Sequence, residues 1–146
     1  MIPLKDENPT NKKPIVSYCI IGFCVVIFLA QLGLSESELR DFTYSYGLIP
    51  SVLMGIDQLP NDLFKISPVG TIFTSMFMHG GWMHLIGNML YMWIFADNIE
   101  DDLGILNFVI FYLICGIGAA MSQVLMDINS QIPMIGASGA IGGVLG

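Results

Sequence analysis

Basic side chains are scarce in this sequence and absent from its second half. Five Lys and Arg residues stand against 12 Asp and Glu residues, and none follows Lys65. Proteins that bind nucleic acid neutralise its phosphates with clustered Lys and Arg. The sequence therefore predicts no nucleic-acid partner.

Cysteines and histidines are also few. Cys19, Cys24 and Cys115 lie inside apolar runs, whereas disulfide frameworks and zinc knuckles use closely paired cysteines in polar surroundings. We interpret the three as small buried hydrophobes. His79 and His84 are five positions apart with no acid between them, unlike the two histidines of a metalloprotease helix, which are four apart and flank a Glu. We expect neither a metal site nor a cofactor.

Charge of either sign is sparse: 12% of residues are charged and 54% are hydrophobic, outside the range of soluble proteins. No acid or base lies between Lys13 and Glu36. Residues 15–34 therefore offer the roughly 20 apolar positions that a 30 Å hydrocarbon layer requires. A removable signal peptide is the weaker interpretation, because there is no basic region at the very terminus and no small-residue cleavage site.

Three more stretches are free of charge, between Lys65 and Asp97, between Asp102 and Asp127, and from Ile128 to the last residue. Open sheet edges cannot be satisfied in lipid, so the sequence predicts an all-α polytopic membrane protein. We expect three full spans plus the start of a fourth, at about residues 15–34, 82–98, 103–126 and 136–146.

The segments between the spans set the expected topology. Residues 35–81 mix polar residues, Pro and Gly with short apolar pieces, as in an interfacial loop. Lysines in residues 1–14 place this amino-terminal segment in the cytoplasm by the positive-inside rule. Residues 35–81 and 127–135 then lie outside, and the acidic turn 97–102 lies inside.

Polar residues inside membrane spans are functional candidates. His84 and Asn88 are four apart, hence on one face of a helix. Ser138, between glycines at the start of the last span, is a candidate nucleophile, because a helix amino terminus offers free N–H groups to an oxyanion. Each residue also has a structural interpretation, as a hydrogen-bonding or small packing residue between helices. The G-x-S-x-G elbow of soluble hydrolases is not met, since Ala140 replaces its second Gly.

Several short motifs occur together in a characteristic order and spacing. In this order the chain resembles the rhomboid family of intramembrane serine proteases. The motifs are Met1-Ile2-Pro3-Leu4-Lys5-Asp6, Gly47-Leu48-Ile49-Pro50, His79-x4-His84-x3-Asn88, Asp97-Asn98-Ile99-Glu100-Asp101 with Leu103-Gly104, Phe111-Tyr112-Leu113 with Cys115-Gly116, and Gly136-Ala137-Ser138-Gly139.

The resemblance implies a rhomboid-like bundle of at least six transmembrane helices with a water-filled cavity. It implies that Ser138 attacks a peptide bond in or near a transmembrane segment of a membrane-protein substrate, within the lipid bilayer. It assigns oxyanion stabilisation to His84 and Asn88. We expect structural roles for the remaining motif residues, which are His79, Glu100, Gly136 and Gly139.

One departure from the family pattern concerns the general base. Rhomboids provide it as a histidine on the sixth span, and this sequence contains only two histidines, both in the second-span motif. The helix from Ser138 to Gly146 would also extend only about 13 Å. We interpret the chain as the amino-terminal part of a rhomboid protease, inactive by itself. The alternatives are a non-catalytic rhomboid-like protein that binds transmembrane helices, and a structural or transport subunit that assembles through its small-residue faces.

Overall fold

The computed structural model describes Thr10 and residues 13–146. The opening motif, Lys5 and Lys12 lie outside the described residues, as does most of the expected cytoplasmic segment. The described part is all-helical, as predicted, apart from one isolated β-bridge. Its helices are α1 (Ile15–Leu32), α2 (Glu36–Tyr46), α3 (Pro50–Leu53), α4 (Pro68–Ser75), α5 (Trp82–Leu103), α6 (Ile105–Met126) and α7 (Ser138–Leu145).

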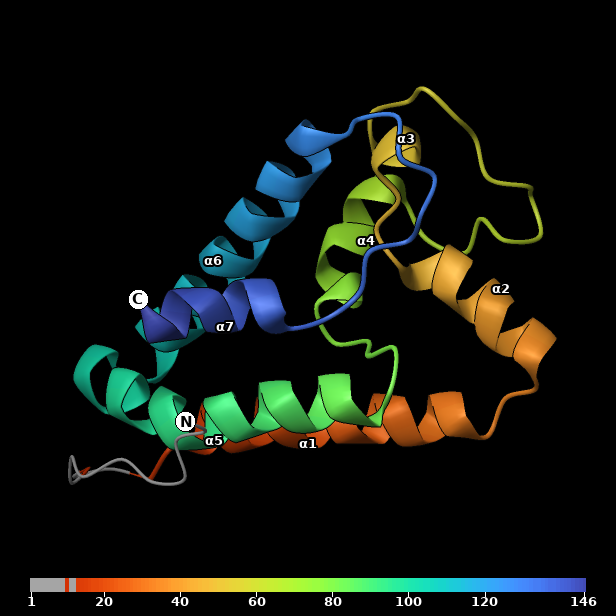
Figure 1. Cartoon of the computed structure of the whole chain (residues 1–146). Helices are drawn as coiled ribbons and strands as arrows, with labels where there is room; N and C mark the ends of the chain where they lie inside the picture. Colours follow the sequence, from red (N-terminus) through yellow and green to blue (C-terminus); the bar gives the residue numbers. More distant parts are fainter. Residues whose placement is uncertain (1–9, 11–12) are drawn as a thin grey trace.

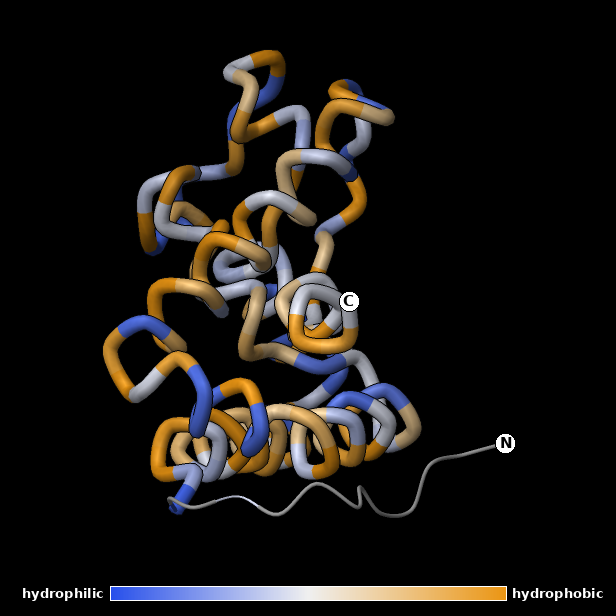
Figure 2. The backbone as a smooth tube through the Cα atoms, turned by 90° about the vertical axis from the view of Figure 1, so that its left-hand side faces the viewer, coloured by the Kyte–Doolittle hydropathy of each residue, from blue (hydrophilic) through white to orange (hydrophobic). Residues whose placement is uncertain are grey.

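Four helices alternate in direction along the chain (Figure 1). Helices α1 and α5 run antiparallel in one layer, α6 returns across the molecule, and α7 runs back between α6 and α5. Figure 2 shows α7 nearly end-on above the layer of α1 and α5. Within the described residues, α1 and α6 are long and apolar enough to cross a membrane.

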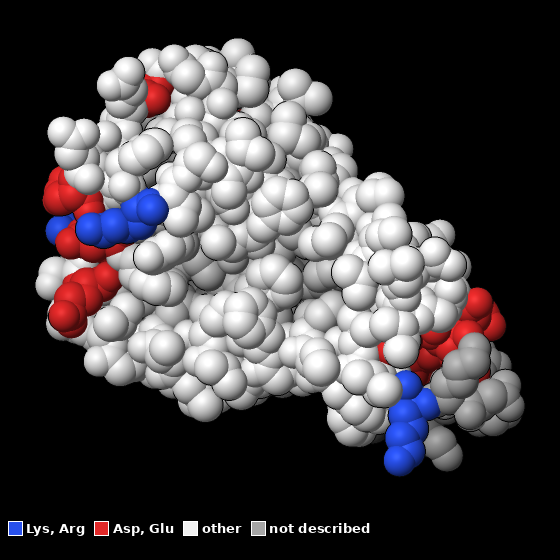
Figure 3. Space-filling view, turned by 180° about the vertical axis from the view of Figure 1, so that it is seen from behind, with Lys and Arg blue, Asp and Glu red and all other residues white. Residues whose placement is uncertain are grey.

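Charged side chains gather at two opposite ends of the face shown in Figure 3, with an uncharged belt between them. This distribution fits a bundle whose middle lies in hydrocarbon, because charged groups are expensive there. Helix α5 contributes its uncharged part, residues 82–96, to this belt, and its acidic residues lie at the carboxyl end.

The expected acidic turn at 97–102 is helical instead. Helix α5 continues through these residues and ends at Leu103, before Gly104, whose φ is +78°. No Gly or Pro interrupts the acidic segment, so the first position able to reverse the chain is this left-handed glycine. The turn between α5 and α6 is therefore tighter than the sequence predicts.

Small residues bring α6 and α7 close together. A Cβ atom added at Gly143 would lie 2.3 Å from the Cys115 Sγ, and one at Gly139 would lie 2.6 Å from the Ala119 Cβ. This packing explains the glycines of α7. The prediction that all the cysteines are buried holds for Cys24, is wrong for Cys19, which is exposed on α1, and is met only in part by the half-buried Cys115. The reason is that an apolar side chain on a membrane helix can face lipid and does not have to be buried against other helices.

The interfacial region between α1 and α5 folds against the segment before α7. Leu48 and Met134 form the β-bridge, in which their N–H groups and carbonyls exchange hydrogen bonds of 3.0 and 2.8 Å. The Ser51 N–H also donates to the Ser130 carbonyl at 3.0 Å. These contacts join segments that are far apart in the sequence and fix where α7 begins.

Candidate active site

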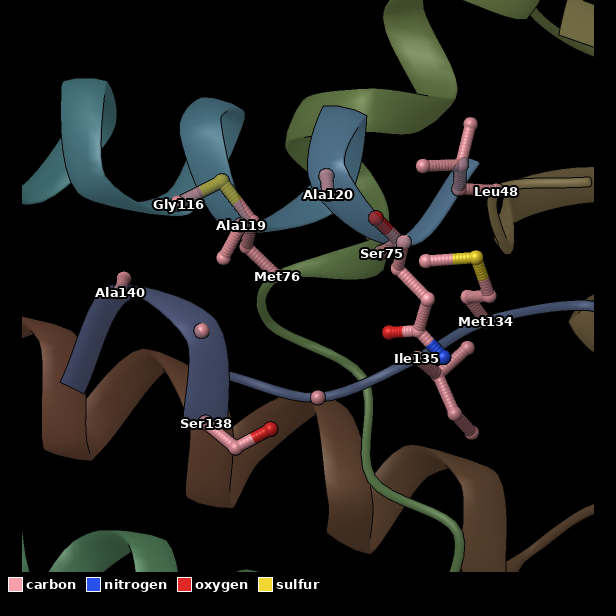
Figure 4. A pocket seen from close by; sticks show the side chains of 13 residues that line it. Leu48, Ser75, Met76, Gly116, Ala119, Ala120, Met134, Ile135, Ser138 and Ala140 are labelled. Atoms are coloured by element: carbon pink, nitrogen blue, oxygen red, sulfur yellow. The ribbon is translucent and has the colours of Figure 1, made fainter. Parts of the chain in front are cut away.

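Ser138 is the first residue of α7 and is exposed. The loop before it is held by a hydrogen bond of 2.8 Å from the Gly136 N–H to the Ser75 carbonyl, at the end of α4. Ser138 lies at the edge of a cavity of about 120 Å³ between α4, α6 and α7 (Figure 4). Ser138 is thus accessible, and the loop before it is anchored to the end of α4.

The side chains of His84 and Ser138 both lie next to Gly136. A Cβ atom added to Gly136 would lie 2.6 Å from the Cε1 and Nε2 atoms of His84 and 3.7 Å from the Ser138 Oγ. The imidazole edge and the hydroxyl therefore lie beside the same glycine, although they are 54 positions apart in the sequence. Gly136 has φ +129°, a conformation that disfavours any other residue.

Asn88 lies one helical turn beyond His84 on α5. Its side chain is 8% exposed, and the Nδ2 atom has no hydrogen-bond partner among the described residues. Buried amide donors are nearly always paired in folded proteins. Asn88 thus places an unpaired, buried amide donor one helical turn from His84.

His79 contacts His84 from the loop before α5. The two ring centroids are 5.1 Å apart and the rings meet edge to face at 66°. His79 is 1% exposed, and its backbone N–H donates to the Oε1 of Gln31 at 3.4 Å. Burial, reinforced by the electrostatic interaction with His84, lowers the pKa of His79 to about 4. His79 is therefore neutral at physiological pH and packs against the ring beside Ser138.

Glu100 lies at the opposite end of α5. Its carboxylate accepts hydrogen bonds from the Val16 N–H at 2.9 Å, the Ser17 N–H at 2.8 Å and the Ser17 hydroxyl at 2.7 Å. It thus binds the amino end of α1, where the N-cap, Pro14, makes no side-chain hydrogen bond.

The structure brings three of the residues singled out from the sequence, Ser138, Gly136 and His84, to one place. Asn88 and His79 adjoin this group, Gly139 packs against α6, and Glu100 lies away from it. Ser75 was not predicted, because it acts through its carbonyl oxygen and no sequence pattern marks it. In the described part of the chain no group of three or more His, Cys, Asp or Glu residues could hold a metal ion.

Comparison with known proteins identifies the family. Residues 67–146 match the family model described as Rhomboid domain. The chain is 37% identical over 125 residues to RHOMBOID-like protein 4 of Arabidopsis thaliana. This match covers 86% of this chain and 31% of that protein. It is 31% identical over 75 residues to RHOMBOID-like protein 5 and 35% identical over 75 residues to RHOMBOID-like protein 6, mitochondrial, both from Arabidopsis thaliana; each match covers 51% of this chain and 24% of the relative.

The family match covers more than half of the chain and includes every residue of the candidate site. This chain belongs to the rhomboid family. It spans about a quarter to a third of the length of these curated relatives.

Proposed function

We propose that this chain carries the nucleophile and the oxyanion-stabilising groups of an intramembrane serine endopeptidase. The enzyme would hydrolyse peptide bonds in or near transmembrane segments of membrane-protein substrates. The observation that carries the proposal is the approach of the His84 imidazole and the Ser138 hydroxyl at Gly136, with the unpaired Asn88 amide one turn away.

In this mechanism the Ser138 Oγ attacks the carbonyl carbon of the substrate peptide bond, and negative charge develops on the carbonyl oxygen. The Ser138 N–H at the start of α7 and the side chains of His84 and Asn88 are the donors for that oxygen. One such donor stabilises a transition state by about 3 kcal/mol. The tetrahedral intermediate then expels the leaving amine and leaves an acyl ester on Ser138.

The proton of the Ser138 hydroxyl requires a base. His84 is assigned to the oxyanion, and one ring nitrogen cannot donate to that oxygen and accept the serine proton at once. His79 is buried, and its pKa of about 4 makes it a weak base. We therefore propose that the general base comes from a residue outside positions 1–146.

A second candidate function is a rhomboid-like protein that binds transmembrane helices without cutting them. The retained Ser138, His84 and Asn88 favour the protease, because binding alone needs neither a nucleophile nor an unpaired donor.

We further propose a multi-pass location in the cell membrane, with the amino terminus in the cytoplasm. The lysines before α1 support this orientation. Because α1 and α5 are antiparallel, the amino end of α1 and Glu100 lie on one side. Ser138 then faces the opposite, outer side.

The proposal is tested on the complete gene product in membranes, with a fluorophosphonate and a transmembrane reporter substrate. We expect wild-type protein to be labelled and to cleave the reporter, and Ser138→Ala to do neither. Ser122→Ala, which changes an exposed serine of α6, is the matched control and should behave as wild type. Reporter cleavage by Ser138→Ala would exclude the assigned nucleophile, and an unlabelled protein that still binds the reporter would support the helix-binding function.

A further inference from the structure

An apolar groove lies between α2 and α1, beside α4 and away from Ser138. It has a volume of about 290 Å³, and most of its lining is aromatic, from Phe23, Phe42, Tyr46, Phe73 and Phe77, with Ile27 beside them. Thr74 also lines it, but its hydroxyl is engaged, since it donates to the Tyr46 carbonyl at 2.6 Å. We call this feature the aromatic groove.

Helix α1 shows how far below the membrane surface the aromatic groove lies. Ile27 and Phe23 lie five and nine residues before the end of α1 at Leu32, or about 7 and 13 Å along the helix axis. Half of a 30 Å hydrocarbon core is about 15 Å thick. The groove therefore lies at the level of the acyl chains in the leaflet on the side of α2.

Helix α2, which lines the groove with Phe42 and Tyr46, carries more acidic than basic side chains. Glu36, Glu38 and Asp41 outnumber the single base of the helix, Arg40, which itself lies 3.5 Å from the Asp41 carboxylate. The charged cluster at one end of the molecule is visible in Figure 3. An acidic surface at headgroup level repels anionic lipids and favours a headgroup that carries an ammonium group.

We infer that the aromatic groove binds one acyl chain of a zwitterionic phospholipid, whose headgroup lies beside the acidic side chains of α2. Aromatic and aliphatic walls without a free polar partner suit a hydrocarbon chain. The chain would fill the space between α2 and α1 and so hold α2 in place. This inference rests on residence in a membrane and not on proteolysis.

The test uses the complete gene product in phosphatidylcholine vesicles that contain a trace of lipid with a photoactivatable diazirine in its acyl chain. The probe is either phosphatidylethanolamine or phosphatidylglycerol, and cross-linked peptides are mapped by mass spectrometry. We expect cross-links at the residues of the aromatic groove. Phosphatidylethanolamine should label about fivefold more than phosphatidylglycerol, the preference that about 1 kcal/mol per headgroup charge gives.

Two variants of adjacent residues distinguish the groove from the general lipid surface. Ile27→Trp fills the groove and should lower its labelling about tenfold, because bulk at the site excludes the acyl chain. Val26→Trp adds a Trp at a neighbouring position that is 63% exposed and does not line the groove, and labelling should stay at the wild-type level. If circular dichroism shows that Ile27→Trp is unfolded, Phe42→Glu on α2 serves instead, since a carboxylate in the groove also excludes hydrocarbon.

Three results would overturn the inference. Labelling of the groove that is unchanged in the folded groove variant would show only the annular lipid that coats every exposed face. Equal or stronger labelling by phosphatidylglycerol would contradict the preference for a zwitterionic headgroup. Cross-links between two copies of the chain through the groove residues would show that protein occupies the groove.

Discussion

Gly136 has no side chain at the point where the His84 imidazole and the Ser138 hydroxyl approach the loop before α7. A Cβ atom there would lie 2.6 Å from two ring atoms of His84, closer than real Cβ contacts, and the φ of +129° adds backbone strain. The histidine ring would have to move, and displacement of a catalytic group by about 1 Å can reduce a rate 10²-fold.

We therefore predict that Gly136→Ala lowers kcat/KM of the complete protein by about 10²-fold or more. The matched control is Gly142→Ala in α7, where a Cβ atom would meet nothing within 4 Å and alanine favours the helix. Reporter cleavage and fluorophosphonate labelling are measured for both. Activity of Gly136→Ala within a factor of about two of the control would contradict the close approach of His84.

Asn88 offers a second residue-scale prediction. Because its Nδ2 atom has no partner within the described structure, Asn88→Ala removes no hydrogen bond donated by that atom. The variant should lower kcat by about 10²-fold without lowering the melting temperature. Asn107→Ala on α6, which loses a hydrogen bond of 3.0 Å to the carbonyl of Leu103 at the end of α5, is the control and should retain wild-type kcat.

A separate result would refute the Asn88 assignment. If Asn88→Ala cleaves the reporter at the wild-type rate, its amide is not an oxyanion donor. If it melts at a clearly lower temperature, the amide has a structural partner in the folded protein.

The sequence predicts part of this site and leaves part unpredicted. Spacing of four places His84 and Asn88 on one helical face, because helical periodicity is local. The meeting of His84 with Ser138 depends instead on the Leu48–Met134 bridge and on the hydrogen bond to the Ser75 carbonyl. Backbone groups of distant segments make these contacts, and no residue pattern encodes them.

At the scale of elements, Glu100 joins α5 to α1. A carboxylate that accepts three hydrogen bonds at a helix amino terminus satisfies orphan donors and favours the helix dipole. It also explains how α5 tolerates acidic residues in its last turns, where negative charge opposes the dipole. The sequence places Glu100 near a helix end, but no local pattern indicates that its partner is Ser17, 83 positions away.

We predict that Glu100→Gln lowers the free energy of unfolding by about 1.5–3 kcal/mol, the usual contribution of hydrogen bonds to a charged group. Activity per folded molecule should be unchanged, since Glu100 lies at the far end of α5 from His84. Thermal unfolding in detergent and specific activity check this, with the exposed Asp102→Asn as control. A fully stable but inactive variant would show a role in chemistry.

At the scale of the whole molecule, the alternating directions of α1, α5, α6 and α7 fix which loops share a side of the membrane. We predict that cysteines introduced at Ser35 and Asn129 react with an impermeant maleimide on intact cells, and that one at Asp102 reacts only after lysis. All three positions are exposed. The variants are made in a background without Cys19, Cys24 and Cys115. The reverse labelling pattern would invert the proposed orientation.

The last prediction concerns residues 1–146 as a unit. This chain holds the proposed nucleophile but no histidine besides His79 and His84, and a serine without a base in reach is a poor nucleophile. We expect residues 1–146 in membranes to show neither labelling of Ser138 nor cleavage of a transmembrane reporter, and the complete gene product to show both.

The same two assays show whether the general base lies outside residues 1–146 or is His84. Helix α7 packs through Gly139 and Gly143 on α6, while its outward face, at Gly142 and Leu145, is exposed in this chain. If co-expression of the remaining segment restores both signals, the site is completed by helices that pack on that face and carry the base. Cleavage by residues 1–146 alone that disappears in Ser138→Ala would instead show that His84 accepts the serine proton, and its assignment to the oxyanion would be wrong.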